Sequence, residues 1–287
     1  MRPVHYITLA VAIAIIALLY WGGNTIPPRE KAEAGMQRPS SGGSVSQGPN
    51  TMKAASIDSI LAALKMQLPK TAADTVKTLE QEVSAISDAS QMAVVFTRLS
   101  KVWERNKQYP VAVFYKAKAA KLENSEKSLT FAAQLFLELM EHEGDRALQM
   151  WEANEAISCL EQAMKLNPNS EEARLAMASA YIQGTAEPMK GVQMALAMTR
   201  DNPEHIPANM LLGRMSIQSG QFEKAIKRFE TVLKKEPENK EALYFLAQAY
   251  EGTGNKQKAI EMLEKCKLVV NNPEFSKEID QHINSLK

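Results

Sequence analysis

One 34-residue pattern occurs twice in succession between residues 206 and 273. The second copy matches the first at equivalent positions, which are Ala208, Leu212, Gly213, Gly220, Ala225, Ile226 and Phe229 in one and Ala242, Leu246, Ala247, Gly254, Ala259, Ile260 and Leu263 in the other. Each copy contains two short amphipathic stretches of helical period with a glycine between them. Two short helices cannot bury their apolar faces alone, so neighbouring units must stack. The repeat therefore predicts a helical solenoid.

The spacing of small and large residues resembles the tetratricopeptide repeat, whose unit has small residues at positions 8, 20 and 27 and large residues at positions 4, 7, 11 and 24. In residues 240–273 the small positions hold Ala247, Ala259 and Cys266. Residues 206–239 depart from the pattern at Asn209 and Ser216. Small residues let two helix axes approach closely, and a larger side chain there would cost roughly 1–3 kcal/mol. The resemblance implies an all-α, right-handed solenoid of helix hairpins.

Five such units cover about two thirds of the chain, in a solenoid that spans residues 89–273. Their ranges are approximately 93–126, 127–170, 171–205, 206–239 and 240–273. The second unit is longer than the others, because Ala112 and Ala156 are 44 residues apart rather than 34. We place the extra residues in the turn between its two helices, with the first helix at residues 129–140.

Helical segments flank the repeats on both sides. Residues 274–287 have an apolar stripe with polar residues elsewhere, which predicts a helix that caps the last unit. Residues 55–88 contain two apolar faces separated by Pro69, which predicts a helical pair. This pair either packs on Phe96 and Trp103 as a cap or degenerate repeat, or forms a dimerisation hairpin.

The amino-terminal region has the pattern of a membrane anchor and a linker. After a tail at residues 1–5, residues 6–21 form an uncharged, mostly apolar run bracketed by Tyr6 and Trp21, which favour the headgroup layer. We interpret this run as a single-pass transmembrane helix. A cleaved signal peptide is the alternative, although no small-x-small cleavage site follows the run. Residues 22–54 lack apolar periodicity and are rich in proline, glycine and serine, which predicts a flexible linker.

The charges beside this run favour the opposite orientation from the one we predict. Arg2 precedes the run, whereas Arg29, Lys31 and Arg38 follow it, and the positive-inside rule would keep the following domain in the cytoplasm. A short tail before an apolar run has the form of an export signal, however, and long domains translocate largely regardless of charge. We therefore predict a protein of the inner (cytoplasmic) membrane with its solenoid on the extracytoplasmic side.

Composition and motifs argue against several functional classes. The 34 basic and 33 acidic side chains alternate along helix faces, which disfavours binding to nucleic acid. Cys159 and Cys266 lie in separate units and are interpreted as small buried hydrophobes. The histidines have no partners at metal-ligand spacing, and no nucleophile or phosphate-loop motif is present in the sequence. The sequence thus predicts no catalytic site, no metal and no cofactor.

The resemblance implies that the first helices of successive repeats line a concave groove, in which a peptide or partner helix would bind. The residues that it places in the groove are Thr97, Arg98, Lys101, Leu175, Ser179, Ile182, Met210, Arg214, Ile217, Gln218, Tyr244, Gln248 and Glu251. A sharper hypothesis lays the partner along Met210, Ile217 and Tyr244, because apolar groups on an exposed face favour binding.

The sequence therefore predicts a membrane-tethered scaffold or adaptor that mediates protein–protein interactions in the assembly of envelope complexes, with no enzymatic activity. One alternative is an assembly factor similar to the interaction subunits of cytochrome c maturation, which present a client polypeptide. Another is an enzyme or regulator whose active site lacks a recognisable motif. The expected partners are proteins or peptides in the groove and the membrane at residues 6–21, and a homodimer is a further alternative.

Overall fold

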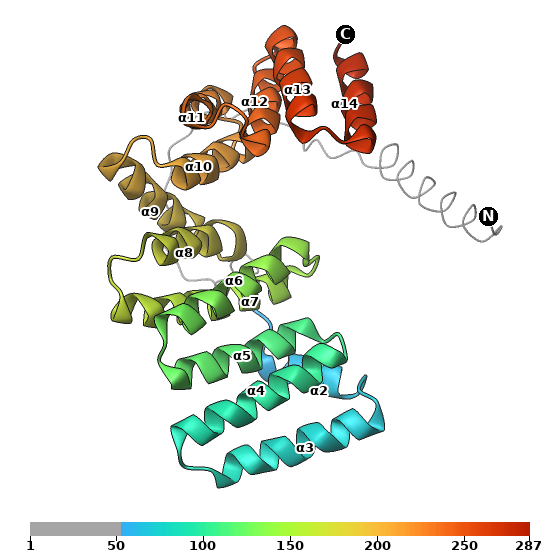
Figure 1. Cartoon of the computed structure of the whole chain (residues 1–287), viewed down its shortest axis with the longest axis vertical. Helices are drawn as coiled ribbons and strands as arrows, with labels where there is room; N and C mark the ends of the chain where they lie inside the picture. Colours follow the sequence, from blue (N-terminus) through green and yellow to red (C-terminus); the bar gives the residue numbers. More distant parts are fainter. Residues whose placement is uncertain (1–52) are drawn as a thin grey trace, which may run out of the picture. The chain divides into compact units, whose positions relative to one another are not determined.

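A computed structural model describes residues 53–287, in which helices follow one another through short turns (Figure 1). This part of the chain contains thirteen α-helices and no strand, which confirms the all-α prediction. The helices are α2 (Ile57–Lys65), α3 (Lys70–Ala85), α4 (Ala89–Arg105), α5 (Tyr109–Glu123), α6 (Glu126–His142), α7 (Arg146–Leu166), α8 (Glu171–Gly184), α9 (Pro188–Asp201), α10 (Ile206–Gln218), α11 (Phe222–Lys235), α12 (Lys240–Gly252), α13 (Lys256–Val270) and α14 (Pro273–Leu286).

Consecutive helices pack as hairpins, and the hairpins stack in chain order (Figure 1). The pairs are α4 with α5, α6 with α7, α8 with α9, α10 with α11, and α12 with α13. The second helix of each pair also contacts the first helix of the next pair. In addition, α6, α8, α10 and α12 contact one another in order, and we call these four helices the first-helix row. The predicted solenoid of stacked helix hairpins is confirmed for the described residues.

The turns between paired helices explain why glycine recurs. Gly220 and Gly254 have positive φ angles of 69° and 76°, a conformation that glycine adopts without steric cost. The amide that follows each glycine donates to the carbonyl five residues earlier, at 2.8 Å in both turns. Lys107 has a φ of 58° between α4 and α5, and the next amide donates in the same way at 3.0 Å. The same bend therefore closes three of the hairpins.

Small residues lie at buried contacts between helices. Ala225, Ala247 and Ala259, at small positions of the two regular repeats, have no exposed surface. At another such position, a Cβ atom added to Gly213 would lie 2.6 Å from the ring of Phe229. Real Cβ contacts are longer than this, so a larger residue would force the helices apart. The small positions are thus packing positions.

Polar side chains begin several of the helices. The Ser170 side chain accepts from the amide of Ala173 at the start of α8, and Asn239 accepts from Ala242 at the start of α12. Such caps satisfy amides that have no partner within the helix. Proline lies in the first turn of α5, α9, α10 and α14, where its missing amide costs nothing.

The extra residues of the second unit lie in its helices, so the prediction of a long turn at this point is wrong. Helix α6 extends to His142, α7 begins at Arg146, and only three residues separate them. The added turns of α7 are stable because they are covered on several sides. Trp151 is 5% exposed and packs edge-on against Phe136, with ring centroids 5.6 Å apart. Arg146 donates to two carbonyl oxygens at the end of α8, those of residues 183 and 185.

The two ends of the solenoid are covered by flanking helices. Val76 and Leu79 of α3 are buried in the same cluster as Phe96 and Trp103 of α4, which is the arrangement that the packing alternative describes. Before α2, the amide of residue 55 donates to the carbonyl of residue 147 in α7 at 2.9 Å. At the other end α14 packs on α13.

Buried apolar side chains of residues 53–287 form three clusters rather than one. The first extends from α3 to α8, and another extends from α10 to α14. A small cluster of Ala178, Ala195, Leu211 and Leu212 lies between them. A hollow of about 650 Å³ lies between α9 and α11 at this junction, lined by Met189 and Val192 from α9 among others. The solenoid core is therefore divided near α9.

The predicted anchor at residues 6–21 and most of the predicted linker lie outside the described residues. Among the helices of residues 53–287, none combines the length and the apolar character needed to cross a membrane.

Candidate binding surfaces

Five of the predicted groove residues come together on the first-helix row. Ile182 of α8, Arg214, Ile217 and Gln218 of α10, and Gln248 of α12 line one hollow of about 350 Å³. The adjoining apolar wall includes Leu211 and Phe245. The guanidinium of Arg214 lies 3.2 Å from the Glu241 carboxylate, in an ion pair that is partly exposed. We call this site the row hollow; it offers apolar contact with one cation beside it.

Other predicted groove residues lie beside the row hollow without lining it. Met210 is only 8% exposed and belongs to the core cluster, so its side chain is not available on an open face as the sharper hypothesis requires. Tyr244 is half-buried, with its ring 5.8 Å from that of Phe245. Leu175 and Ser179 of α8 are also half-buried.

The predicted groove residues of the first and last units are separate from this site. Thr97, Arg98 and Lys101 line a different hollow, of about 580 Å³, with the end of α5. Arg98 forms an ion pair with Glu82 of α3 at 2.7 Å. At the other end, a carboxylate oxygen of Glu251 lies 3.1 Å from Nε2 of His282 in α14. The predicted residues are thus distributed over more than one surface.

A second cavity lies where the first-helix row stops. Helices α5 and α7 contact each other at this point, and the space between α4 and α6 forms a cavity of about 540 Å³. Its lining residues are Ser100, Glu104, Tyr109, Pro110, Ala112, Val113, Lys116, Leu135, Glu138, Leu139, His142, Glu143 and Glu152. We call it the α4–α6 cavity.

Glu152 is the unusual member of the α4–α6 cavity. It is fully buried, and neither of its carboxylate oxygens has a hydrogen-bond partner among the described residues. Burial raises the pKa of Glu152 to about 8, with a smaller contribution from the negative charge of Glu143. The Glu152 carboxyl group is therefore largely protonated at neutral pH.

Sequence reasoning missed this cavity, because the predicted groove contains no residue of the second unit. The available signal was the insertion between Ala112 and Ala156. It lengthens α7 by about two turns at its amino-terminal end, and Glu152 lies in that extension. A glutamate directly between the apolar residues Trp151 and Ala153 was the further clue.

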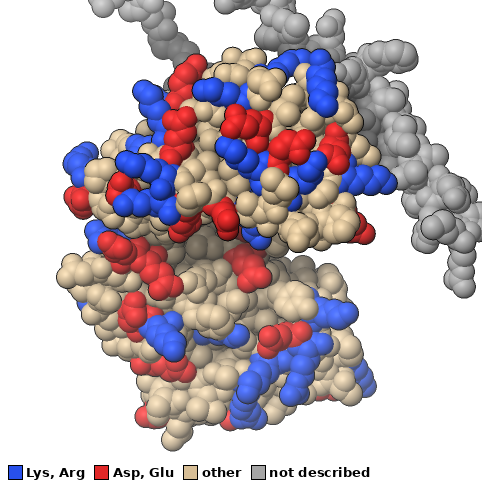
Figure 2. Space-filling model, turned by 45° about the horizontal axis from the view of Figure 1, so that its top comes forward, with Lys and Arg blue, Asp and Glu red and all other residues tan. Residues whose placement is uncertain are grey.

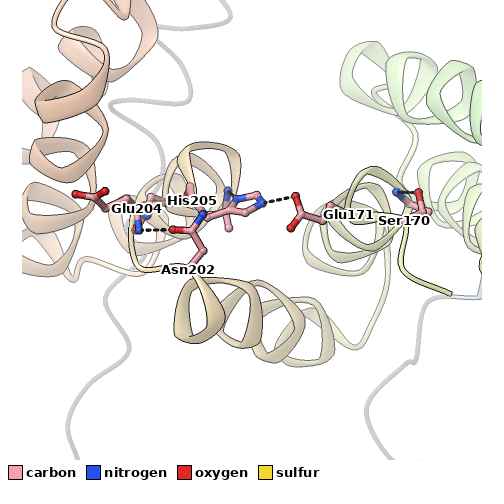
Figure 3. A network of polar contacts seen from close by, with 8 residues as sticks. Ser170, Glu171, Asn202, Glu204 and His205 are labelled. Carbon is pink, nitrogen blue, oxygen red and sulfur yellow. Dashed lines mark hydrogen bonds and ion pairs between the residues drawn. The ribbon is translucent and has the colours of Figure 1, made fainter.

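A polar network joins the third and fourth units (Figure 3). His205 caps α10, because its Nδ1 accepts from the amide of Ala208 at 3.1 Å. Its Nε2 atom lies 3.6 Å from the Glu171 carboxylate at the start of α8 (Figure 3). Nearby, the buried Asn209 accepts from Arg228 of α11 at 2.9 Å. Each of these side chains has a structural partner, so the network serves to connect helices.

Charges of both signs are mixed on the face that Figure 2 shows, and neither sign forms a broad patch there. Among residues 53–287, no group of three or more His, Cys, Asp or Glu side chains could hold a metal ion. Cys159 and Cys266 are buried free thiols, and burial raises the pKa of Cys159 to about 11.

Part of this chain matches a known family, and several solved structures are similar to it at low sequence identity. The tetratricopeptide repeat family model matches residues 216–276. A tetratricopeptide repeat protein from Parabacteroides merdae is 15% identical over 80% of this chain and 92% of its own, with a TM-score of 0.47. The type IV pilus biogenesis factor PilW is 20% identical over 68% of this chain and 90% of its own, with a TM-score of 0.45.

YrrB, described as a tetratricopeptide repeat protein with an unusual peptide-binding site, is 14% identical. The match covers 72% of this chain and 99% of YrrB, with a TM-score of 0.43. Among curated proteins, none matches this chain in sequence.

Proposed function

We propose that this protein is an interaction scaffold that holds a segment of another polypeptide across α8, α10 and α12. The observation that carries the proposal is the row hollow, where Ile182, Ile217 and Gln248 come together from three helices. An apolar side chain of the partner would occupy the hollow. A carboxylate or carbonyl group of the partner would compete with Glu241 for Arg214, which is only partly exposed in its present ion pair.

The family match supports this proposal, because tetratricopeptide repeats generally mediate protein–protein interactions. The matched segment, residues 216–276, includes Ile217, Gln218 and Gln248 of the row hollow. Apolar groups on an accessible helical surface commonly mark binding sites for a peptide or helix.

Site-specific photo-crosslinking in cells tests the proposal. A photoreactive amino acid in place of Gln218, which is exposed at the row hollow, is expected to give a discrete adduct with a partner protein. The control position is Lys234, which is exposed near the end of α11. The adduct at position 218 should disappear when Ile217→Asp is added, provided that the variant melts at the same temperature. Equal adducts from both positions, or an adduct that survives Ile217→Asp, would contradict the proposal.

We further propose that residues 6–21 tether the solenoid to the inner membrane, with the solenoid on the extracytoplasmic side, where it would take part in the assembly of envelope complexes. The motivation is the apolar run bracketed by Tyr6 and Trp21. A single Ser44→Cys substitution tests sidedness, because the two native cysteines are buried and would react slowly. An impermeant thiol reagent should label this variant in intact spheroplasts. Labelling only after lysis would place the solenoid in the cytoplasm.

A further inference from the structure

We propose that the α4–α6 cavity binds an ammonium group carried on an apolar chain. The cavity is a separate site from the row hollow, since it is formed by α4, α5, α6 and α7. Its volume of about 540 Å³ falls within the range typical of small-molecule sites, roughly 300–1,000 Å³. Three features of the cavity lead to this chemistry.

The first feature is an unsatisfied acceptor. Glu152 lines the cavity, has no exposed surface, and has no hydrogen-bond partner on either oxygen among the described residues. Buried polar groups in folded proteins are nearly always hydrogen-bonded, because an unpaired one is costly. A donor that reaches this carboxyl group from the cavity would remove this cost.

The second feature is the sign of the surrounding charge. Each element around the cavity contributes titratable groups: Glu104 from α4, Tyr109 and Lys116 from α5, Glu138 and His142 from α6, Glu143 from the turn and Glu152 from α7. Carboxyl groups thus outnumber the one lysine. The Nζ atom of Lys116 lies 5.4 Å from the centre of the Phe131 ring, so this cation has a partner of its own. A ligand that brings a positive charge is therefore favoured over an anion.

The third feature is the apolar wall. Ala112 and Val113 of α5 and Leu135 and Leu139 of α6 line the cavity together with the acidic groups. A bare metal ion would gain nothing from these side chains, whereas an alkyl chain would be removed from water on contact with them. A primary amine on a short alkyl chain satisfies both the carboxyl group and the wall.

Proton linkage gives this site a distinctive pH dependence. Because burial raises the pKa of Glu152 to about 8, an ammonium group that binds the ionised carboxylate must displace a proton near neutral pH. The affinity for an alkylammonium ion should therefore increase from pH 6 to pH 8, while the amine itself stays protonated.

Calorimetric titration of the full-length protein with n-pentylamine tests the proposal, with pentanoate as the probe of opposite charge. We expect binding of pentylamine that tightens from pH 6 to pH 8, and no binding of pentanoate. The variant Glu152→Gln should weaken the affinity for pentylamine at least about tenfold and remove its pH dependence, because the charge-assisted hydrogen bond is lost. Equal affinity in wild type and Glu152→Gln, or equal binding of pentanoate, would overturn the proposal.

A second variant and a second probe complete the experiment. Leu139 is half-buried in the wall of the cavity, so the larger side chain of Leu139→Trp should narrow the cavity and lower the affinity for pentylamine. Circular dichroism checks that this variant folds. The peptide acetyl-Gly-Lys-Gly-amide, compared with its norleucine analogue, distinguishes a lysine side chain of a polypeptide from a free amine. Selective binding of the lysine peptide would identify the ligand as a lysine side chain of a polypeptide. Binding of pentylamine alone would identify it as a free amine. If neither pentylamine nor the lysine peptide binds, the cavity is not an ammonium site.

Discussion

Three residues of the described chain close hairpins with the same bend, yet only two of them are glycine. Gly220, Gly254 and Lys107 all have φ between 58° and 76°. For a residue with a Cβ atom this conformation costs about 1–2 kcal/mol, whereas glycine adopts it freely. Lys107 is exposed, and its amide donates to the carbonyl of Glu104 at 2.9 Å.

We therefore expect Lys107→Gly to stabilise the protein by about 0.5–1 kcal/mol, after the greater entropy of glycine in the unfolded chain is subtracted. Urea denaturation measures this change. The reciprocal variant Gly220→Lys is the control, because a Cβ atom at Gly220 would meet no atom within 4 Å and only the backbone strain is tested. It should destabilise the protein. If neither variant changed the free energy of unfolding, the backbone at this bend would not be strained.

The buried carboxyl group of Glu152 predicts an unusual dependence of stability on pH. Its pKa is raised to about 8 in the folded state, from a reference value of 4.5. The folded state thus holds a proton that the unfolded state releases, so stability is greatest below the unfolded pKa and falls as pH rises toward 8. The expected loss between pH 5 and pH 8 is on the order of a few kcal/mol.

Glu152→Gln should remove this loss and stabilise the protein at pH 8. Urea denaturation at several pH values, followed by the fluorescence of the buried Trp103 and Trp151, measures the effect. Glu104→Gln, an exposed residue of the same cavity, is the matched control and should keep the wild-type slope. A Glu152→Gln variant with the wild-type slope would show that the group is ionised in the folded protein.

Single residues also mark where sequence reasoning reached its limit. Asn209 departs from the repeat pattern, and the sequence gives no reason for a polar residue at that position. Its amide donates to the carbonyls of residues 203 and 205, and its oxygen accepts from Arg228. These partners come from a loop and a later helix, so they depend on how the chain packs. The repeat pattern shows that Asn209 is an exception, but it does not predict the hydrogen bonds that stabilise this residue.

Among the helices, the contact between α12 and α13 shows what the small positions do. Ala259 is fully buried where these two helices pack. A leucine at this point would be overpacked, so Ala259→Leu should destabilise the last hairpin by about 1–3 kcal/mol. Gln257→Leu adds the same side chain at an exposed position of the same helix and should change stability by less than about 0.5 kcal/mol. Thermal melting compares the two variants; equal melting temperatures would show that position 259 is not a tight contact.

The number of hairpins could be predicted from the sequence, whereas the lengths of α6 and α7 could not. Helical periodicity reports that an apolar face exists, but a helix continues only as far as other elements cover that face. The added turns of α7 are covered by Phe136, by the end of α8 at Gly184 and by the segment before α2. These contacts are distant in sequence. The sequence shows that residues are inserted in this unit, but the helical conformation of those residues depends on tertiary packing.

For the whole solenoid, the repeat was sufficient to predict the architecture, because each unit contacts mainly its neighbours and local pattern determines local packing. The groove was predicted only in part. Ile182, Arg214 and Gln248 meet in the row hollow, but the capping helix provides a partner for Glu251, and Met210 turns into the core. Repeat position gives the side of a helix, and the presence of a neighbouring element decides whether that side stays open.

The divided core predicts that the solenoid unfolds in two parts. Buried residues of α3–α8 and those of α10–α14 form separate clusters, and only a small cluster connects them through Ala178 and Ala195. In a linear array, a weak interface between neighbouring units lets the blocks on either side open independently.

Native-state hydrogen exchange should therefore show two levels of amide protection, with the change near α9. Ala259→Leu is expected to lower protection in α10–α14 only, whereas Ala132→Leu, at a fully buried site in α6, should lower it in α3–α8 only. If either substitution lowered protection equally in every described helix, the two clusters would unfold as a single cooperative unit. The small cluster at α8–α10 would then stabilise the interface much more than its four buried residues indicate.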